Sequence, residues 1–156
     1  MILKRVKLSF AVVILALLPA CTKQQPGDPP GTAAIKNFKQ GLLIAKPSIS
    51  AARIALPLVK QLDEEDRKAA NAILDDVSHA RDTFDSKLAP YDHFDSSNAQ
   101  EVKKLATDAI DTLDELNRTG VTHIKNADAR ALASAAIEAL RTAADMLLKA
   151  EPFAPA

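Results

Sequence analysis

The sequence predicts an all-α protein, an antiparallel up-down four-helix bundle with a kinked first helix. Four segments repeat apolar residues at three- and four-residue spacing, which is the periodicity of an amphipathic helix. No segment alternates apolar and polar residues beside a hairpin turn, so we expect no strands. Short connections between the segments favour antiparallel neighbours. Heptad-like stripes are also typical of a two- or three-stranded coiled coil, but the broad apolar faces and the kinked first segment favour a single-chain bundle.

The first helical segment covers residues 32–61, with Thr32 as the expected N-cap. Two prolines interrupt its periodicity. Pro47 is expected to end or kink the helix, because the residue before a proline avoids the α region. Pro57 removes a helical hydrogen bond and predicts another kink. The inward-facing apolar positions are expected to be Ile35, Phe38, Leu42, Ile49, Ala52, Leu56 and Val59.

The second segment starts with four acidic residues at positions 63–66, which suit the exposed N–H groups and dipole of a first helical turn. Pro90 predicts that this helix ends near Ala89. Its inward stripe is expected to contain Ala70, Ile73, Val77, Ala80 or Arg81, Phe84 and Leu88.

The third and fourth segments carry clearer end signals. Ser97 followed by Gln100 has the pattern of a capping box, and Gly120 is placed as a C-terminal cap. Asn126 or Asp128 is expected to cap the last helix, at about residues 127–150. The two inward stripes are Val102, Ala106, Ala109, Leu113 and Leu116, and then Leu132, Ala136, Leu140, Ala143, Leu147 and Ala150.

The chain begins with a pattern typical of an export signal. Lys4, Arg5 and Lys7 precede an apolar run at positions 8–18 that one serine interrupts. A run of roughly eleven residues is too short to remain as a membrane-spanning helix and is typical of a secretory signal. It ends in the tetrapeptide LPAC, residues 18–21, in which a small residue precedes the only cysteine of the chain.

This segment resembles the signal peptide of a bacterial membrane lipoprotein, whose lipobox reads leucine, a variable residue, a small residue and cysteine. Pro19 is a mild departure at a loosely defined position. The resemblance implies that residues 1–20 are removed and that Cys21 becomes the N-terminus, carrying a covalent diacylglycerol group and an N-acyl chain such as palmitate. It implies a lipid-anchored protein of the cell envelope. Thr22 after the cysteine is typical of sorting to the outer membrane, facing the periplasm, in Gram-negative bacteria.

The rest of the chain divides into a tether, one domain and a tail. Residues 21–31 comprise the lipidated cysteine and a flexible tether rich in proline and glycine, with a reach of about 30 Å at roughly 3.1 Å per residue. Residues 32–151 form the helical bundle domain, which is long enough to bury a core of its own. Residues 152–156 contain two prolines and are expected to fray.

Charge is distributed unevenly along the chain. Without residues 1–20 it carries 17 basic and 20 acidic residues, a net charge of −3, which gives no reason to expect a nucleic-acid partner. Residues 22–61 have a net charge of +5 and residues 62–156 a net charge of −8. One explanation is that a basic first helix packs beside acidic neighbours. The other is that this segment contacts anionic head groups or an acidic partner.

Few residues suggest chemistry. Asp75, His79 and Asp82 share one helix face, but a solvated polar stripe explains them without a metal; a di-iron site would need Glu-x-x-His from two helices. The acidic row Asp108, Asp111, Asp114 and Glu115 is most simply a solvated face. The loop histidines His93 and His123 have no nucleophile that the sequence places beside them. We therefore expect no catalytic residue, no metal and no cofactor.

Two functions of different class follow. The first is a membrane-anchored, non-catalytic lipoprotein whose bundle acts as a cell-envelope interaction or scaffold module, with an envelope protein as partner. The second is a lipoprotein that holds a small apolar ligand or lipid between its helices. The second hypothesis rests on four alanines that could leave room for a guest, Ala106, Ala109, Ala136 and Ala143.

Overall fold

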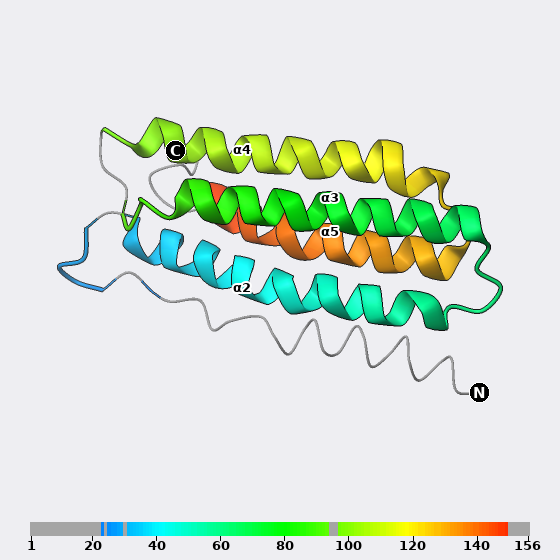
Figure 1. Cartoon of the computed structure of the whole chain (residues 1–156). Helices are drawn as coiled ribbons and strands as arrows, with labels where there is room; N and C mark the ends of the chain where they lie inside the picture. The colour runs from blue at the N-terminus through cyan, green and yellow to red at the C-terminus, as the bar shows by residue number, and fades with distance from the viewer. Residues whose placement is uncertain (1–22, 24, 30, 94–96, 150–156) are drawn as a thin grey trace.

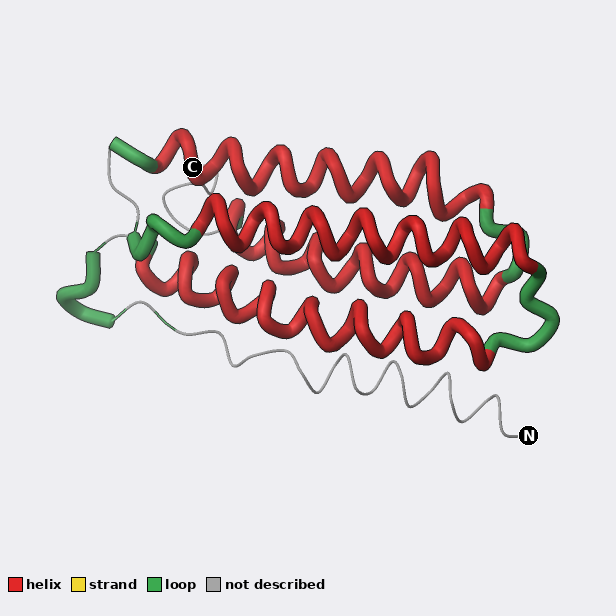
Figure 2. Tube along the Cα trace, in the orientation of Figure 1, coloured by secondary structure: helices red, strands yellow, loops and turns green. Residues whose placement is uncertain are grey.

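The computed structural model describes residues 23, 25–29, 31–93 and 97–149, and within them it is all-helical, with four α-helices and no strand. Figures 1 and 2 show the helices side by side in one bundle. Cys21, the export signal and the tail from residue 150 lie outside the described residues. The helices are α2 (Thr32–Ala55), α3 (Glu64–Leu88), α4 (Ala99–Glu115) and α5 (Ala127–Leu148).

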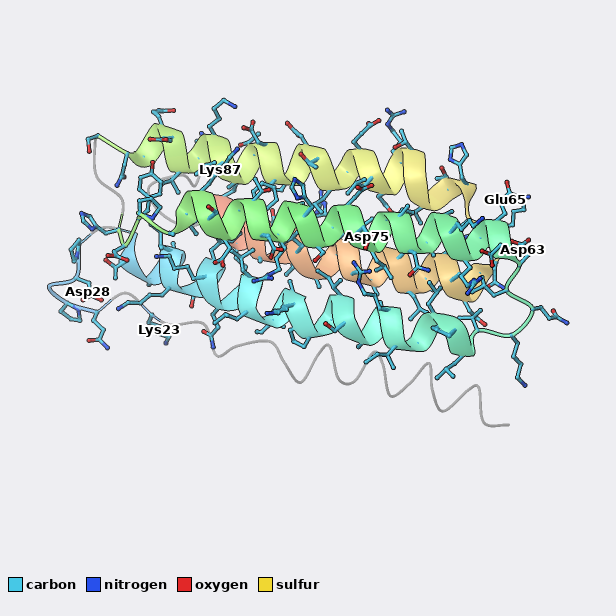
Figure 3. The ribbon with its side chains drawn as sticks, in the orientation of Figure 1. Lys23, Asp28, Asp63, Glu65, Asp75 and Lys87 are labelled. Carbon is cyan, nitrogen blue, oxygen red and sulfur yellow. The ribbon has the colours of Figure 1, made fainter. Side chains whose placement is uncertain are left out.

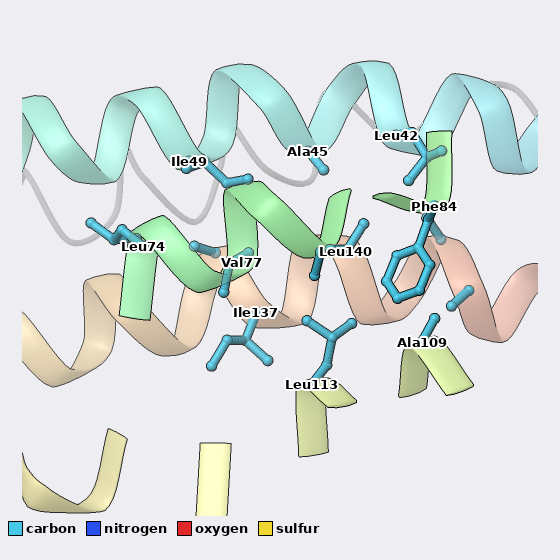
Figure 4. Packing of buried hydrophobic residues seen from close by; sticks show 14 of the residues in the cluster. Leu42, Ala45, Ile49, Leu74, Val77, Phe84, Ala109, Leu113, Ile137 and Leu140 are labelled. Carbon is cyan, nitrogen blue, oxygen red and sulfur yellow. The ribbon is translucent and has the colours of Figure 1, made fainter. Parts of the chain in front are cut away.

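One apolar core joins the inner stripes of all four helices. Figure 4 shows side chains from each helix converging on it, among them Leu42, Leu74, Leu113 and Leu140. Each of these four is at most 1% exposed, and burying such a side chain contributes about 1.5–3 kcal/mol. Most inward positions expected from the sequence are confirmed as core, including Ile35, Phe38, Ile49, Val77, Phe84, Val102, Ala136, Ala143 and Leu147.

The helix α5 packs against α2, α3 and α4, and its contact with α2 is especially close. A Cβ atom built on Gly41 would lie 2.5 Å from Cβ of Ala143 and 3.3 Å from its Cα. Real Cβ atoms do not approach so closely, so the two backbones can adopt this separation only because position 41 has no side chain. Small residues on both helices bring α2 and α5 together.

Two helix starts are as the sequence predicted. An oxygen of Asp63 accepts a hydrogen bond of 2.7 Å from the backbone N–H of Asp66 and caps α3. The side-chain oxygen of Asn126 accepts hydrogen bonds of 3.1 Å from the N–H groups of Asp128 and Ala129 and caps α5. Each cap satisfies N–H groups that have no partner inside the helix. The predicted end of α3 before Pro90 is also confirmed.

Three other cap predictions are wrong. The N-cap of the first described helix is Gly31, and Thr32 is already the first residue of α2. The N-cap of α4 is Asn98, whose side chain makes no capping hydrogen bond, so the Ser97 capping box does not form. Gly120 is not a left-handed C-cap, because its φ is −89° and the chain continues from α4 through a π-helix at Leu116–Gly120 into a 3-10 turn at Val121–His123. The glycine instead admits Ile73, whose Cγ1 and Cδ1 atoms would lie 3.1 and 3.2 Å from a Cβ at position 120.

Pro47 does not end the helix, since α2 runs without a break from Thr32 to Ala55. Proline removes the hydrogen bond to the carbonyl four residues earlier, which belongs to Leu43. Both Pro47 and Leu43 are exposed, so water can bind the freed carbonyl. Pro57 lies beyond the helix, in a 3-10 turn at Leu56–Leu58.

We predict that Gly41→Ala lowers the free energy of unfolding by about 1–2 kcal/mol. Overpacking costs roughly 1–3 kcal/mol, and the better helix propensity of alanine offsets about 0.5–1 kcal/mol of that. Urea denaturation followed by circular dichroism measures the change. The matched control is Gln40→Ala on the exposed side of α2, expected to change stability by less than about 0.5 kcal/mol. Stability raised by Gly41→Ala would show that the two helices are not in tight contact.

Candidate interaction surface

The outward side of α2 exposes large apolar side chains that the core does not use. Leu43 is 68% exposed, Ile54 72% and Leu58 78%, and Pro47 is exposed between them. Leu43, Pro47 and Ile54 lie four and seven residues apart, a spacing that returns to the same side of α2. Leu58 follows four residues later, in the 3-10 turn that continues the helix. We call Leu43, Pro47, Ile54 and Leu58 the outer row of α2.

The outer row gives α2 a second apolar side, opposite the stripe that packs into the core. Within Thr32–Leu58, which comprises α2 and the turn after it, an 18-residue window has a mean hydropathy of 1.2. This segment is therefore long and apolar enough to cross a membrane by length and composition alone. Core helices of water-soluble domains also meet this criterion. Here 28% of the apolar window is buried inside the bundle, and the outer row accounts for much of the apolar surface that remains.

Basic side chains surround the outer row. Lys36, Lys46 and Lys60 are exposed, and none of the three forms an ion pair with any residue that the structure describes. No acidic residue occurs between Asp28 and Asp63, so α2 carries no compensating negative charge of its own. The surface therefore combines exposed apolar groups with unpaired positive charge.

The two other basic residues of α2 have partners on the bundle. The Nζ of Lys39 lies 3.3 Å from a carboxylate oxygen of Asp92, and an Nη of Arg53 lies 2.6 Å from one of Asp75. Two of the basic residues of α2 therefore pack beside acidic residues, as the first explanation of the charge asymmetry expects. Lys36 and Lys46 of α2 and Lys60 in the loop after it are exposed.

A buried carboxylate fixes the end of the bundle where α2 ends. Asp66 is 3% exposed, and its two oxygens accept hydrogen bonds from the backbone N–H groups of Lys125, at 2.9 Å, and Asn126, at 2.6 Å. The side-chain amide of Asn126 in turn donates to the carbonyl oxygens of Lys60, at 3.2 Å, and Gln61, at 3.5 Å. The loop after α2, the start of α3 and the start of α5 are therefore tied together, and Asp63 and Glu65 mark this end in Figure 3.

The same network holds one residue in an unfavourable backbone conformation. Gln61 has a φ of 55°, in the left-handed region that disfavours side chains other than glycine. Such a conformation costs on the order of 1 kcal/mol or more and persists where the surroundings impose it. The hydrogen bonds from Asn126 to Lys60 and Gln61 hold the backbone in this conformation. They also set the direction of the loop that follows Leu58.

Two of the three residues considered for metal binding, Asp75 and Asp82, form ion pairs with arginines. The carboxylate of Asp75 binds Arg53, and that of Asp82 lies 2.6 Å from Arg81, while His79 is exposed on α3. Among the described residues, no group of three or more His, Cys, Asp or Glu side chains is placed to hold a metal ion.

The acidic row on α4 is also partly paired. Asp108 binds Lys104 at 2.6 Å, Glu115 binds Arg118 at 2.6 Å, and Asp114 reaches across to Arg141 of α5 at 2.7 Å. The hydrogen bond from Arg141 is the main cause that holds the pKa of the Asp114 carboxyl below its usual value. This pair links α4 to α5 at the surface.

The outer row of α2 was not among the residues that the sequence singled out. Its signal was present as apolar residues at helical spacing, but the expected break at Pro47 divided it into two pieces. Cys21, the one site residue predicted from the sequence, lies outside the described residues. In comparisons with known proteins, no family model, no curated protein and no solved structure matches this chain.

We predict that Asp66→Asn lowers the free energy of unfolding by about 2–4 kcal/mol. The amide keeps the shape but replaces one acceptor oxygen by a donor, which leaves a backbone N–H of Lys125 or Asn126 buried without a partner. Chemical denaturation of the variant measures this. Asp76→Asn on the exposed side of α3 is the control, and an equally small effect of both substitutions would contradict the structural role of Asp66.

We predict that Arg141→Gln lowers the free energy of unfolding at neutral pH by less than about 1 kcal/mol, because both side chains are partly exposed and water screens the pair. The folded-state pKa of Asp114 is depressed, so the stabilisation is present above the unfolded pKa and is lost as the pH falls through the folded pKa. Urea titrations of wild type and variant should therefore differ at pH 7 and coincide near about pH 2. A difference that persists in acid would point to lost packing instead.

Proposed function

We propose that this chain is a membrane-anchored, non-catalytic helical-bundle lipoprotein that acts as an interaction or scaffold module of the cell envelope. The observation that carries the proposal is the position of the exposed apolar and basic surface. It lies on α2, the first helix after the tether, and therefore on the part of the bundle nearest to Cys21 along the chain.

The anchor in this proposal is Cys21 with its acyl groups. Several acyl chains give stable membrane attachment, whereas a single chain binds only marginally. A tether of residues 22–31 then keeps the bundle within about 30 Å of the lipid surface. This confinement raises the local concentration of the bundle, so even weak contacts there are occupied. The proposed location is the outer membrane facing the periplasm if the host is Gram-negative.

The scaffold in this proposal is an antiparallel up-down bundle whose first helix bends at Pro47. Its support is the alternating direction in which successive helices run in Figure 1, together with the short connections between them. A bundle of this kind is a rigid body, suited to presenting one side to a partner such as an envelope protein.

Two observations favour an interaction role over catalysis or ligand binding. The acidic residues Asp75, Asp82 and Asp114 already bind arginines, which leaves them poorly placed to act as bases or ligands. Of the alanines that could have lined a guest site, Ala143 instead packs directly against Gly41. The small residues at this point bring two helices together and leave no space between them.

We predict that Cys21→Ser moves the protein from the membrane fraction to the soluble fraction, because the residue that would carry the acyl chains is lost. Immunoblotting of fractionated cells measures this, and Thr22→Ser is the matched neighbouring control. Mass spectrometry of the wild-type protein should find acyl groups on Cys21 and no residues 1–20. An unmodified thiol at Cys21 in the natural host would refute the proposal, and a membrane-bound Cys21→Ser protein would show that residues 1–20 act as the anchor.

A further inference from the structure

We propose that the outward side of α2 is a membrane-docking surface that binds anionic phospholipid head groups, with the helix lying along the bilayer. This inference rests on the proposed lipoprotein function, which supplies the membrane. It adds the binding surface, its residues and the class of lipid.

The outer row is shaped for a flat surface. Leu43 and Ile54 are separated by 11 positions of α2, which corresponds to about 16 Å at 1.5 Å per residue, and Leu58 extends the row into the 3-10 turn. Exposed apolar side chains on one side of a helix can enter the boundary between head groups and acyl chains when the helix lies in the interface plane. Exposed apolar side chains that share one side of a helix offer a contact surface that singly scattered residues do not.

The basic residues stand where head-group phosphates would lie. Lys36 precedes the row, Lys46 lies beside it and Lys60 follows it, all three exposed and without an ion pair among the described residues. Long lysine side chains can extend to the phosphates while their apolar stems stay near the row. Near an anionic membrane each such lysine strengthens binding about fivefold.

The remainder of the chain orients this surface. Residues 22–61 have a net charge of +5, and residues 62–156 have a net charge of −8. A negatively charged membrane therefore attracts the α2 side and repels the α3–α5 side, which favours one orientation.

Two other occupants fit less well. A second copy of this chain would bring Lys36, Lys46 and Lys60 of one α2 close to the same unpaired lysines of the other, and like charges repel. Insertion of α2 across the bilayer would remove its inner stripe, including Phe38 and Leu42, from the core shared with α5. Docking on the bilayer surface uses the outer row and leaves the bundle intact.

The test uses the chain from residue 21 to 156 carrying Cys21→Ser, so that no acyl chain contributes to binding. Every α-helix and every core residue described lies between Thr32 and Leu148, so this chain keeps the whole bundle. Circular dichroism of each variant establishes that it is folded. Flotation then measures partition onto vesicles of phosphatidylcholine with about one-third phosphatidylglycerol, and onto vesicles of phosphatidylcholine alone.

We expect binding to the anionic vesicles, at least about tenfold weaker partition onto neutral ones, and loss of binding at high salt. Lys36→Gln, Lys46→Gln and Lys60→Gln together should weaken anionic binding roughly 100-fold, from about fivefold for each lysine. Leu43→Ser, Ile54→Ser and Leu58→Ser together should weaken it about tenfold or more, and none of these side chains is needed in the core. The matched control is Lys68→Gln, Lys87→Gln and Lys103→Gln, which makes the same charge change on α3 and α4 and should leave binding within about twofold.

Three results would overturn the inference. They are no binding to anionic vesicles, an equal loss in the control triple, and dimerisation in analytical ultracentrifugation that the three serine substitutions abolish. Mass spectrometry of Cys21 separates this inference from the proposed function. Acylated Cys21 with no vesicle binding refutes the docking surface and leaves the lipoprotein proposal standing. Vesicle binding with unmodified Cys21 refutes the anchor and supports the α2 surface.

Discussion

The close packing of α2 on α5 is the contact on which the rest of the structure depends. Gly41 and Ala143 allow the two backbones to approach so closely that a single added Cβ would clash. Because α5 also packs against α3 and α4, fixing α2 on α5 fixes the first helix on the whole bundle. When small residues allow two helices to approach closely, more atoms of each helix are in contact. Both the dispersion energy and the buried apolar area then increase.

Polar contacts decide how the ends of the helices are joined. The buried carboxylate of Asp66 receives the N–H groups of Lys125 and Asn126, and Asn126 holds the loop after α2 while capping α5. A carboxylate that accepts two backbone hydrogen bonds meets the requirement that buried charge be paired. Hydrogen bonds depend on the orientation of the groups that they join, whereas apolar burial does not. These hydrogen bonds therefore fix the path of the loop and hold Gln61 in its left-handed conformation. The surface pair of Asp114 and Arg141 adds only a screened contribution.

The helix α2 has two apolar sides with different roles. Its inner stripe completes the core, while Leu43, Ile54 and Leu58 remain outside it. Exposing them has an unfavourable solvation cost, and the bundle gains no packing from them. Two of its four basic residues, Lys39 and Arg53, pair with acidic residues elsewhere in the structure. The other two, Lys36 and Lys46, face solvent, as does Lys60 in the loop after α2. An exposed side that combines apolar groups with positive charge is suited to a partner that is itself apolar and negative, and this is the chemistry of an anionic lipid surface.

The sequence by itself determined the all-α class, the four helical segments and most of the core, because helical periodicity places residues such as Leu42, Val77 and Leu140 on one side whatever the neighbours are. It also indicated where α3 and α5 start, from the acidic residues at 63–66 and from Asn126 or Asp128, because a cap depends on bonds to residues two or three positions away. Only the tertiary structure decided the course of α2 through Pro47, because the cost of a proline depends on whether the freed carbonyl faces water. It likewise decided that Gly120 admits Ile73 instead of capping α4, and that the row from Leu43 to Leu58 stays exposed. Each of these depends on which side of a helix the rest of the chain covers, and local periodicity does not contain that information.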